Sequence, residues 1–64
     1  MKFRELEKII LDDGWYYKDT VGSHYQYVHN IKRGKVTIPK HSGDISKIVE
    51  KSIFKQAQIV RKGE

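Results

Sequence analysis

The residues best suited to chemistry lie in residues 22–27 (GSHYQY), where a glycine turn precedes a histidine and two alternating tyrosines. Histidine is the residue type that both takes up and releases protons near neutral pH. The chain around this histidine is basic, which suggests chemistry on a polyanion such as RNA. RNA carries its own nucleophile, the 2′-hydroxyl, so its cleavage needs proton transfer and stabilisation of a phosphorane. His24 is therefore a candidate acid–base residue, with Gly22 and Ser23 positioned to hold a phosphate. The alternative is an exposed strand histidine without a role.

A second polar segment, residues 37–43 (TIPKHSG), contains Lys40 and His41 directly after a short apolar stretch. His41 fits three roles: a second acid–base group, a phosphate contact, or a turn residue. His29 closes the tyrosine-rich segment on the tyrosine face, which indicates a structural role.

Other kinds of site are disfavoured by the same residues. The three histidines have the spacing His-x4-His-x11-His and the chain has no cysteine, so a zinc site is not expected. Ser23 lacks the strand–elbow–helix context of an acyl-transfer nucleophile, and no GxxxxGK[ST] loop is present. We therefore predict neither a metal nor a cofactor.

The length and composition indicate one small domain, residues 1–64, with residues 60–64 as a flexible tail. A chain of 64 residues has room for one sheet with helices on it, so an active site should be shallow and open. No apolar run approaches the roughly 20 residues of a membrane span, and cysteine is absent. We expect a cytoplasmic protein without membrane association.

The formal net charge of +5 is concentrated after residue 13, whereas residues 1–13 are slightly acidic. This distribution is typical of a surface that binds phosphates. The predicted contacts to the RNA backbone are Lys32, Arg33, Lys35, Lys40 and His41. Besides RNA binding, two interpretations of this positive charge remain: a basic surface for an acidic protein partner, and a solvated lysine-rich face.

The hydrophobic pattern predicts an α+β fold with the order α-β-β-β-α. Helices are expected over residues 3–13 and 45–59, and strands over 15–19, 24–29 and 35–39. Asp44 or Ser46 is the expected cap of the second helix. The strands should form an antiparallel sheet with both helices on one face. Period-2 geometry then places Tyr25 and Tyr27 towards the helices and His24 on the outer face.

Five features together resemble the HicA toxin family, also called YcfA-like mRNA interferases. They are Gly14-Trp15 after the first helix, Gly22-Ser23-His24, Thr37-Ile38-Pro39, His41-Ser42-Gly43 and Lys55-Gln56-Ala57. The resemblance covers about residues 3–59. It implies a fold like that of double-stranded-RNA-binding domains, an endoribonuclease that cuts mRNA, and His24 as the catalytic histidine. It also implies a HicB-type antitoxin that covers the site.

The chain departs from the family pattern in two places. Residues 44–49 (DISKIV) replace the usual DIPKGT, so the last helix should begin near Ser46. Gln58 stands where glycine is common, so this helix should also run longer. A non-catalytic RNA-binding module is the alternative function, because the same charge and fold would serve it.

Overall fold

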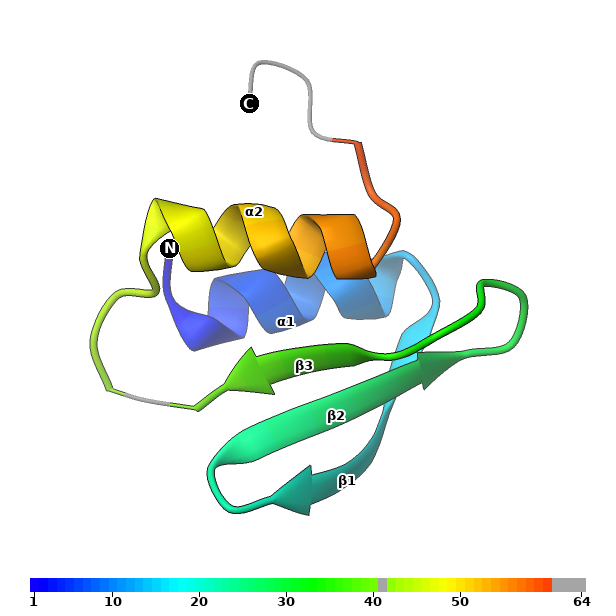
Figure 1. Cartoon of the computed structure of the whole chain (residues 1–64), viewed down its shortest axis with the longest axis horizontal. Coiled ribbons are helices and arrows are strands. Elements are labelled where there is room, and N and C mark those ends of the chain that lie inside the picture. Colours follow the sequence, from blue (N-terminus) through cyan, green and yellow to red (C-terminus); the bar gives the residue numbers. More distant parts are fainter. Residues whose placement is uncertain (41, 61–64) are drawn as a thin grey trace.

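A computed structural model describes residues 1–40 and 42–60 of the chain. Two helices, α1 (Phe3–Asp12) and α2 (Lys47–Gln56), enclose three strands in the sequence: β1 (Trp15–Val21), β2 (His24–His29) and β3 (Val36–Pro39). The strands form an antiparallel sheet in the order β1-β2-β3. Both helices lie on the same face of this sheet (Figure 1). The predicted α-β-β-β-α order and the one-sided helix layer are confirmed.

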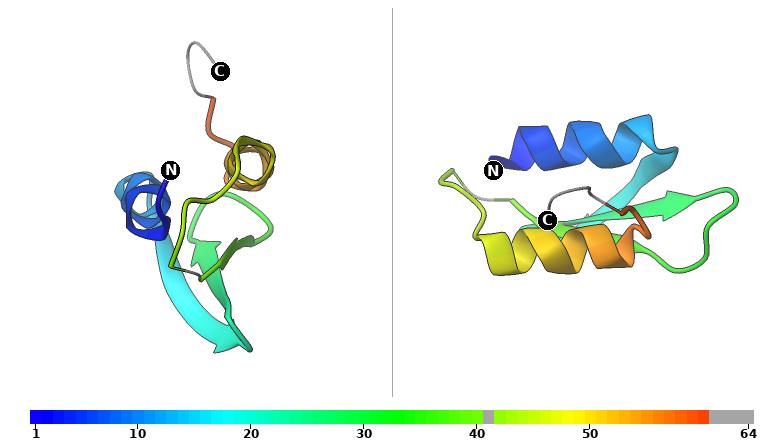
Figure 2. Two further views of the ribbon diagram at one scale, coloured as in Figure 1. Left: turned by 90° about the vertical axis from the view of Figure 1, so that its left-hand side faces the viewer. Right: turned by 90° about the horizontal axis from the view of Figure 1, so that it is seen from above.

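The sheet is only partly covered by the helices. The hairpin formed by β1 and β2 curves away from the helix layer, as the side view in Figure 2 shows. The buried core lies between the helices and the helix-facing side of the sheet. Its members are Phe3, Leu6, Ile10, Trp15, Tyr27, Val36, Ile38, Ile45, Ile53, Phe54 and Ala57.

Helix α1 follows the predicted pattern. Phe3, Leu6 and Ile10 are buried at the expected spacing, and the backbone N–H of Lys2 donates to the Glu5 side chain at 2.9 Å. Gly14 ends the helix with φ +103°, a left-handed conformation that glycine adopts without strain. The stop predicted at this glycine is confirmed.

Strand β1 is longer than predicted because it contains a bulge. The pairing runs Tyr17↔Tyr27 and then Asp19↔Gln26, which leaves Lys18 as an extra residue. Pairing resumes to Val21↔His24, so residues 20 and 21, which the prediction left between the two strands, belong to β1 and the turn consists of Gly22 and Ser23. Gly22 has φ +62°, as the first central residue of a type II′ hairpin turn requires.

Helix α2 is shorter than the predicted 45–59 at both ends. It begins after Ser46, whose hydroxyl accepts the Val49 N–H at 3.3 Å, so the expected start near Ser46 is confirmed. The longer run at the other end is wrong. Gln58 takes φ +56°, and the Ile59 N–H donates to the Phe54 carbonyl at 3.0 Å, which closes the helix with a Schellman motif. The third strand likewise begins at Val36 rather than at residue 35.

Glycine 14 allows a direct test of this packing, because a Cβ there would lie 2.7 Å from Nε2 of His29. Gly34 also has a positive φ, of +85°, but open space around it. We expect Gly34→Ala to lower the free energy of unfolding by about 1 kcal/mol through backbone strain alone. Gly14→Ala should lower it by about 2–4 kcal/mol, since the clash adds to the strain. Chemical denaturation of both variants measures this difference, and equal losses would contradict it.

Candidate functional site

His24 is the first residue of β2 and follows the Gly22–Ser23 turn directly. Its side chain is exposed, whereas Tyr27 is fully buried and Tyr25 is half-buried against the core. Alternation along β2 therefore turns His24 to the sheet face opposite the helices. The predicted orientation of the histidine and the two tyrosines is confirmed.

The surroundings of the His24 imidazole are open and apolar. Its direct partners across the sheet are Val21 on β1, which is 61% exposed, and Pro39 on β3. Among residues 1–40 and 42–60, no side chain forms a hydrogen bond or ion pair with the imidazole. Both ring nitrogens are thus accessible to a ligand, which is what a proton-transfer group needs.

Lys40 lies beside the Gly22–Ser23 turn, but its side chain points away from the His24 imidazole. Its N–H donates to the Ser23 carbonyl at 2.8 Å, which extends the contact between β2 and β3 past Pro39. Its ammonium lies 4.6 Å from the centroid of the Phe3 ring and 5.7 Å from that of Tyr25. Since both rings belong to the helix side, the Lys40 ammonium and the His24 imidazole lie on opposite faces of the sheet.

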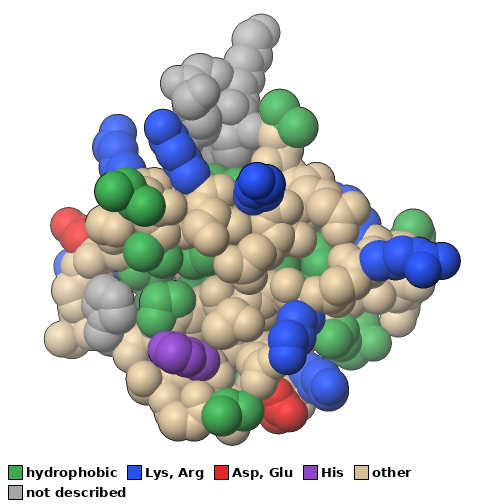
Figure 3. Space-filling view, viewed as in Figure 1, with side chains coloured by type: hydrophobic (Ala, Val, Ile, Leu, Met, Phe, Trp, Pro, Cys, Tyr) green, Lys and Arg blue, Asp and Glu red, His purple; other side chains and the backbone are tan. Residues whose placement is uncertain are grey.

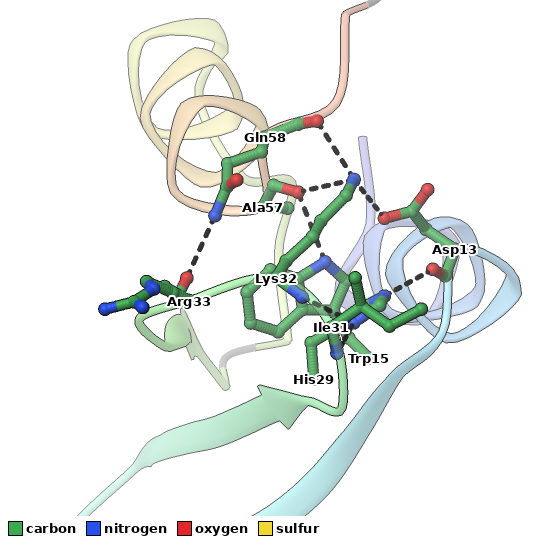
Figure 4. A network of polar contacts seen from close by, with 8 residues as sticks. All are labelled: Asp13, Trp15, His29, Ile31, Lys32, Arg33, Ala57 and Gln58. Carbon is green, nitrogen blue, oxygen red and sulfur yellow. Dashed lines mark hydrogen bonds and ion pairs between the residues drawn. The ribbon is translucent and has the colours of Figure 1, made fainter.

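The basic cluster of residues 32–35 lies at the other end of β2, about 17 Å from His24 at the rise of an extended strand. The Lys32 ammonium forms an ion pair and hydrogen bonds within the fold there, as Figure 4 shows. Its Nζ donates to the Asp13 carboxylate at 2.6 Å and to the carbonyls of Ala57 and Gln58 at 3.2 and 3.0 Å. Arg33 and Lys35 are exposed in the loop. The fold therefore separates this cluster from the histidine.

His29 has the structural role that its position predicted. Its Nδ1 accepts the N–H groups of Ile31 and Lys32, both at 3.0 Å. Nε2 must then carry the hydrogen, which it donates to the Asp13 carbonyl at 2.8 Å. The ring also packs edge-on against Trp15, with centroids 5.1 Å apart. His41 lies outside the described residues.

Tyr27 and Glu7 form a polar pair that the sequence pattern did not reveal. The phenol donates to the Glu7 carboxylate at 2.6 Å. Burial, together with this hydrogen bond, raises the pKa of Tyr27 well above its ordinary value. The phenol therefore stays protonated and acts as a donor. No periodicity could have indicated the pair, because it joins α1 to β2 across the core.

The distribution of charge is uneven over the surface. Lysine and arginine side chains stand along α2 and around the β2–β3 loop in the space-filling view (Figure 3). On α2 these are Lys47, Lys51 and Lys55, all exposed.

Among the described residues, no group of three His, Cys, Asp or Glu side chains is arranged to hold a metal ion. None of the helices in this part of the chain is long and apolar enough to cross a membrane.

A protein-family model matches most of the chain. The family model described as HicA toxin of bacterial toxin–antitoxin matches residues 3–59, which include every element of the fold. No curated protein matches the chain significantly.

The contacts of Lys32 predict a role in stability that its neighbour does not share. Lys32→Met should lower the free energy of unfolding by about 2 kcal/mol, because it leaves the Asp13 carboxylate and the Gln58 carbonyl without this donor and removes one of the two donors to the Ala57 carbonyl. Arg33→Gln removes an equal charge from an exposed side chain and should change it by less than about 0.5 kcal/mol. Thermal or urea unfolding distinguishes the two, and similar stabilities would refute the assignment.

Proposed function

The chain belongs to the HicA toxin family of bacterial toxin–antitoxin systems, and we propose that it is an endoribonuclease that cleaves mRNA with His24 as its acid–base residue. The observation that carries the proposal is the exposed imidazole on the open face of the sheet, which has no partner within the part of the chain that the structure describes. The same residue stands in the Gly-Ser-His sequence that resembles the family motif.

The proposed reaction uses the RNA as its own nucleophile. The 2′-oxygen bonds to the adjacent phosphorus while the bond from phosphorus to the 5′-oxygen breaks. The proton leaves the 2′-hydroxyl, and the departing 5′-oxygen gains one, which yields a 2′,3′-cyclic phosphate and a 5′-hydroxyl. His24 performs one of these two proton transfers. The mechanism has no step that requires a metal ion.

The turn before His24 is suited to holding the scissile phosphate. Apart from its two chain neighbours, no described residue has an atom within 4 Å of the Cβ position of Gly22, so an RNA backbone can approach the chain closely there. In this proposal Gly22 and Ser23 position the phosphate. Further phosphates along the strand contact Arg33, Lys35, Lys40 and His41, and Lys32 adds its charge at the far end of β2.

The partner in this proposal is a HicB-type antitoxin that covers the His24 face. Two apolar side chains on this face are unusually exposed: Val21 at 61% and Tyr16 at 47%. Both lie on β1, and Val21 is the direct neighbour of His24. Apolar exposure next to a catalytic group favours a surface that a protein partner buries. Since mRNA and the antitoxin are cytoplasmic, the toxin would act there.

The catalytic assignment predicts that wild type cleaves mRNA in excess EDTA and that His24→Ala lowers the rate at least about 100-fold. Added imidazole should restore part of the activity, because the exposed position leaves room for it. Gel analysis of a labelled transcript measures the rates, and thermal melting confirms that the variant folds. Undiminished cleavage by His24→Ala would refute the assignment. RNA binding by wild type without any product would favour the non-catalytic module.

The partner surface predicts different effects for two exposed apolar residues. Val21→Asp should weaken binding of the HicB-type antitoxin about tenfold or more, because burying a carboxylate in the interface costs at least about 1.4 kcal/mol. Ile48→Asp, at an 82% exposed position on α2, should leave the affinity unchanged. Titration of each purified variant with the antitoxin measures both constants. Equal affinities would place the interface elsewhere.

A further inference from the structure

Two adjoining hollows lie on the helix side of the sheet, near the end at which His24 is located. They have volumes of about 390 and 570 Å³ and share the lining residues Phe3, Arg4 and Lys40. The first extends along α1 to Tyr25, and the second extends past Lys2 to Ser42. We refer to the two hollows together as the α1 groove.

Two cations in the α1 groove lack an anionic partner among the described residues, whereas two of its carboxylates have hydrogen-bond or ion-pair partners. Glu7 accepts the Tyr27 phenol at 2.6 Å, and Asp12 pairs with Lys8 at 3.2 Å. In contrast, neither the Arg4 guanidinium nor the Lys40 ammonium forms an ion pair within residues 1–40 and 42–60. The residues that line the groove include the four cations Lys2, Arg4, Lys8 and Lys40 against the three carboxylates Glu5, Glu7 and Asp12, so its net charge is positive, which favours an anionic occupant.

The floor of the groove is aromatic. The Lys40 ammonium stands over the Phe3 and Tyr25 rings, which meet edge-to-face with centroids 5.2 Å apart. Tyr25 remains half-exposed beside it. A cation next to an accessible aromatic ring is the combination that binds single-stranded nucleic acid, through the phosphate and the face of the base or sugar.

The groove is connected to the candidate catalytic residue through the chain itself. Tyr25 follows His24 in β2 and faces the groove, while His24 faces outwards. The Lys40 N–H donates a hydrogen bond to the Ser23 carbonyl, so Lys40, which lines the groove, lies directly beside the Gly22–Ser23 turn. A strand held at His24 thus needs only to pass over this end of the sheet to enter the groove.

We infer that the α1 groove is a second RNA subsite, in which Arg4 and Lys40 bind a phosphodiester further along the RNA from the scissile one and Tyr25 contacts the adjoining nucleoside. This inference rests on the proposed function for the position of the scissile phosphate. It adds Arg4 and Tyr25 to the residues that recognise the substrate. It also makes the RNA path cross from one face of the sheet to the other.

The test measures binding of a fluorescein-labelled single-stranded RNA of about ten nucleotides to proteins that carry His24→Ala, so that cleavage does not interfere. Arg4→Gln and Lys40→Gln should each weaken binding about three- to tenfold and reduce the salt dependence by about 0.7 in the log–log slope. Lys51→Gln removes an exposed lysine from α2 and should change neither quantity. Thermal melting checks that each variant is folded.

The outcomes separate this inference from the proposed function. Affinities and slopes equal to those of the control would overturn the RNA subsite, even if His24→Ala abolishes cleavage. Unchanged RNA binding with weakened antitoxin binding would also overturn it, because the groove would then hold an acidic peptide. Full cleavage by His24→Ala would refute the catalytic assignment, and binding would then be measured with the same RNA methylated at its 2′-oxygens, which lacks the nucleophile and cannot be cleaved.

Discussion

The Lys32 ammonium joins the ends of three elements, and the arrangement of the two layers depends on it. It follows β2, binds Asp13 at the end of α1, and donates to the Ala57 and Gln58 carbonyls at the end of α2. The Trp15 indole donates to the same Ala57 carbonyl at 3.2 Å. Last-turn carbonyls lack partners within their helix, so a cation there satisfies them and complements the helix dipole. His29 completes this junction by holding the Asp13 backbone.

The junction leaves the two ends of the sheet with different properties. At its own end, the side chains of Trp15, His29 and Lys32 are committed to structure. At the opposite end, the hairpin turn and the first residue of β2 extend away from the helices (Figure 2). The backbone of His24 is therefore held by strand pairing on both sides, while its side chain makes no hydrogen bond or ion pair with the described residues. A rigid backbone that carries a free imidazole is what a shallow active site in a small domain requires.

The β1 bulge determines which side chains share the face of His24. If β1 paired regularly without a bulge at Lys18, Val21 would point to the same face as Tyr17, which is the helix side of the sheet. With the bulge, Val21 lies directly opposite His24, and Thr20 lies opposite Tyr25. The apolar neighbour of His24 on β1, Val21, is thus placed there by the bulge at Lys18. The bulge also separates the tyrosine cluster of Tyr17, Tyr25 and Tyr27 from Val21.

The sequence by itself determined the element order, the inward face of each helix and the outward direction of His24, because these follow from local periodicity and from glycine turns. The family likeness rests on the same local motifs. Tertiary structure alone decided that α2 stops at Gln56, since the left-handed Gln58 also donates to the Arg33 carbonyl across the fold. Tertiary structure alone also decided that Lys32 pairs with Asp13 and that the Lys40 ammonium stands over the Phe3 ring. The sequence shows how many cations the chain has, 13 lysines and arginines, but only packing decides which of them remain free.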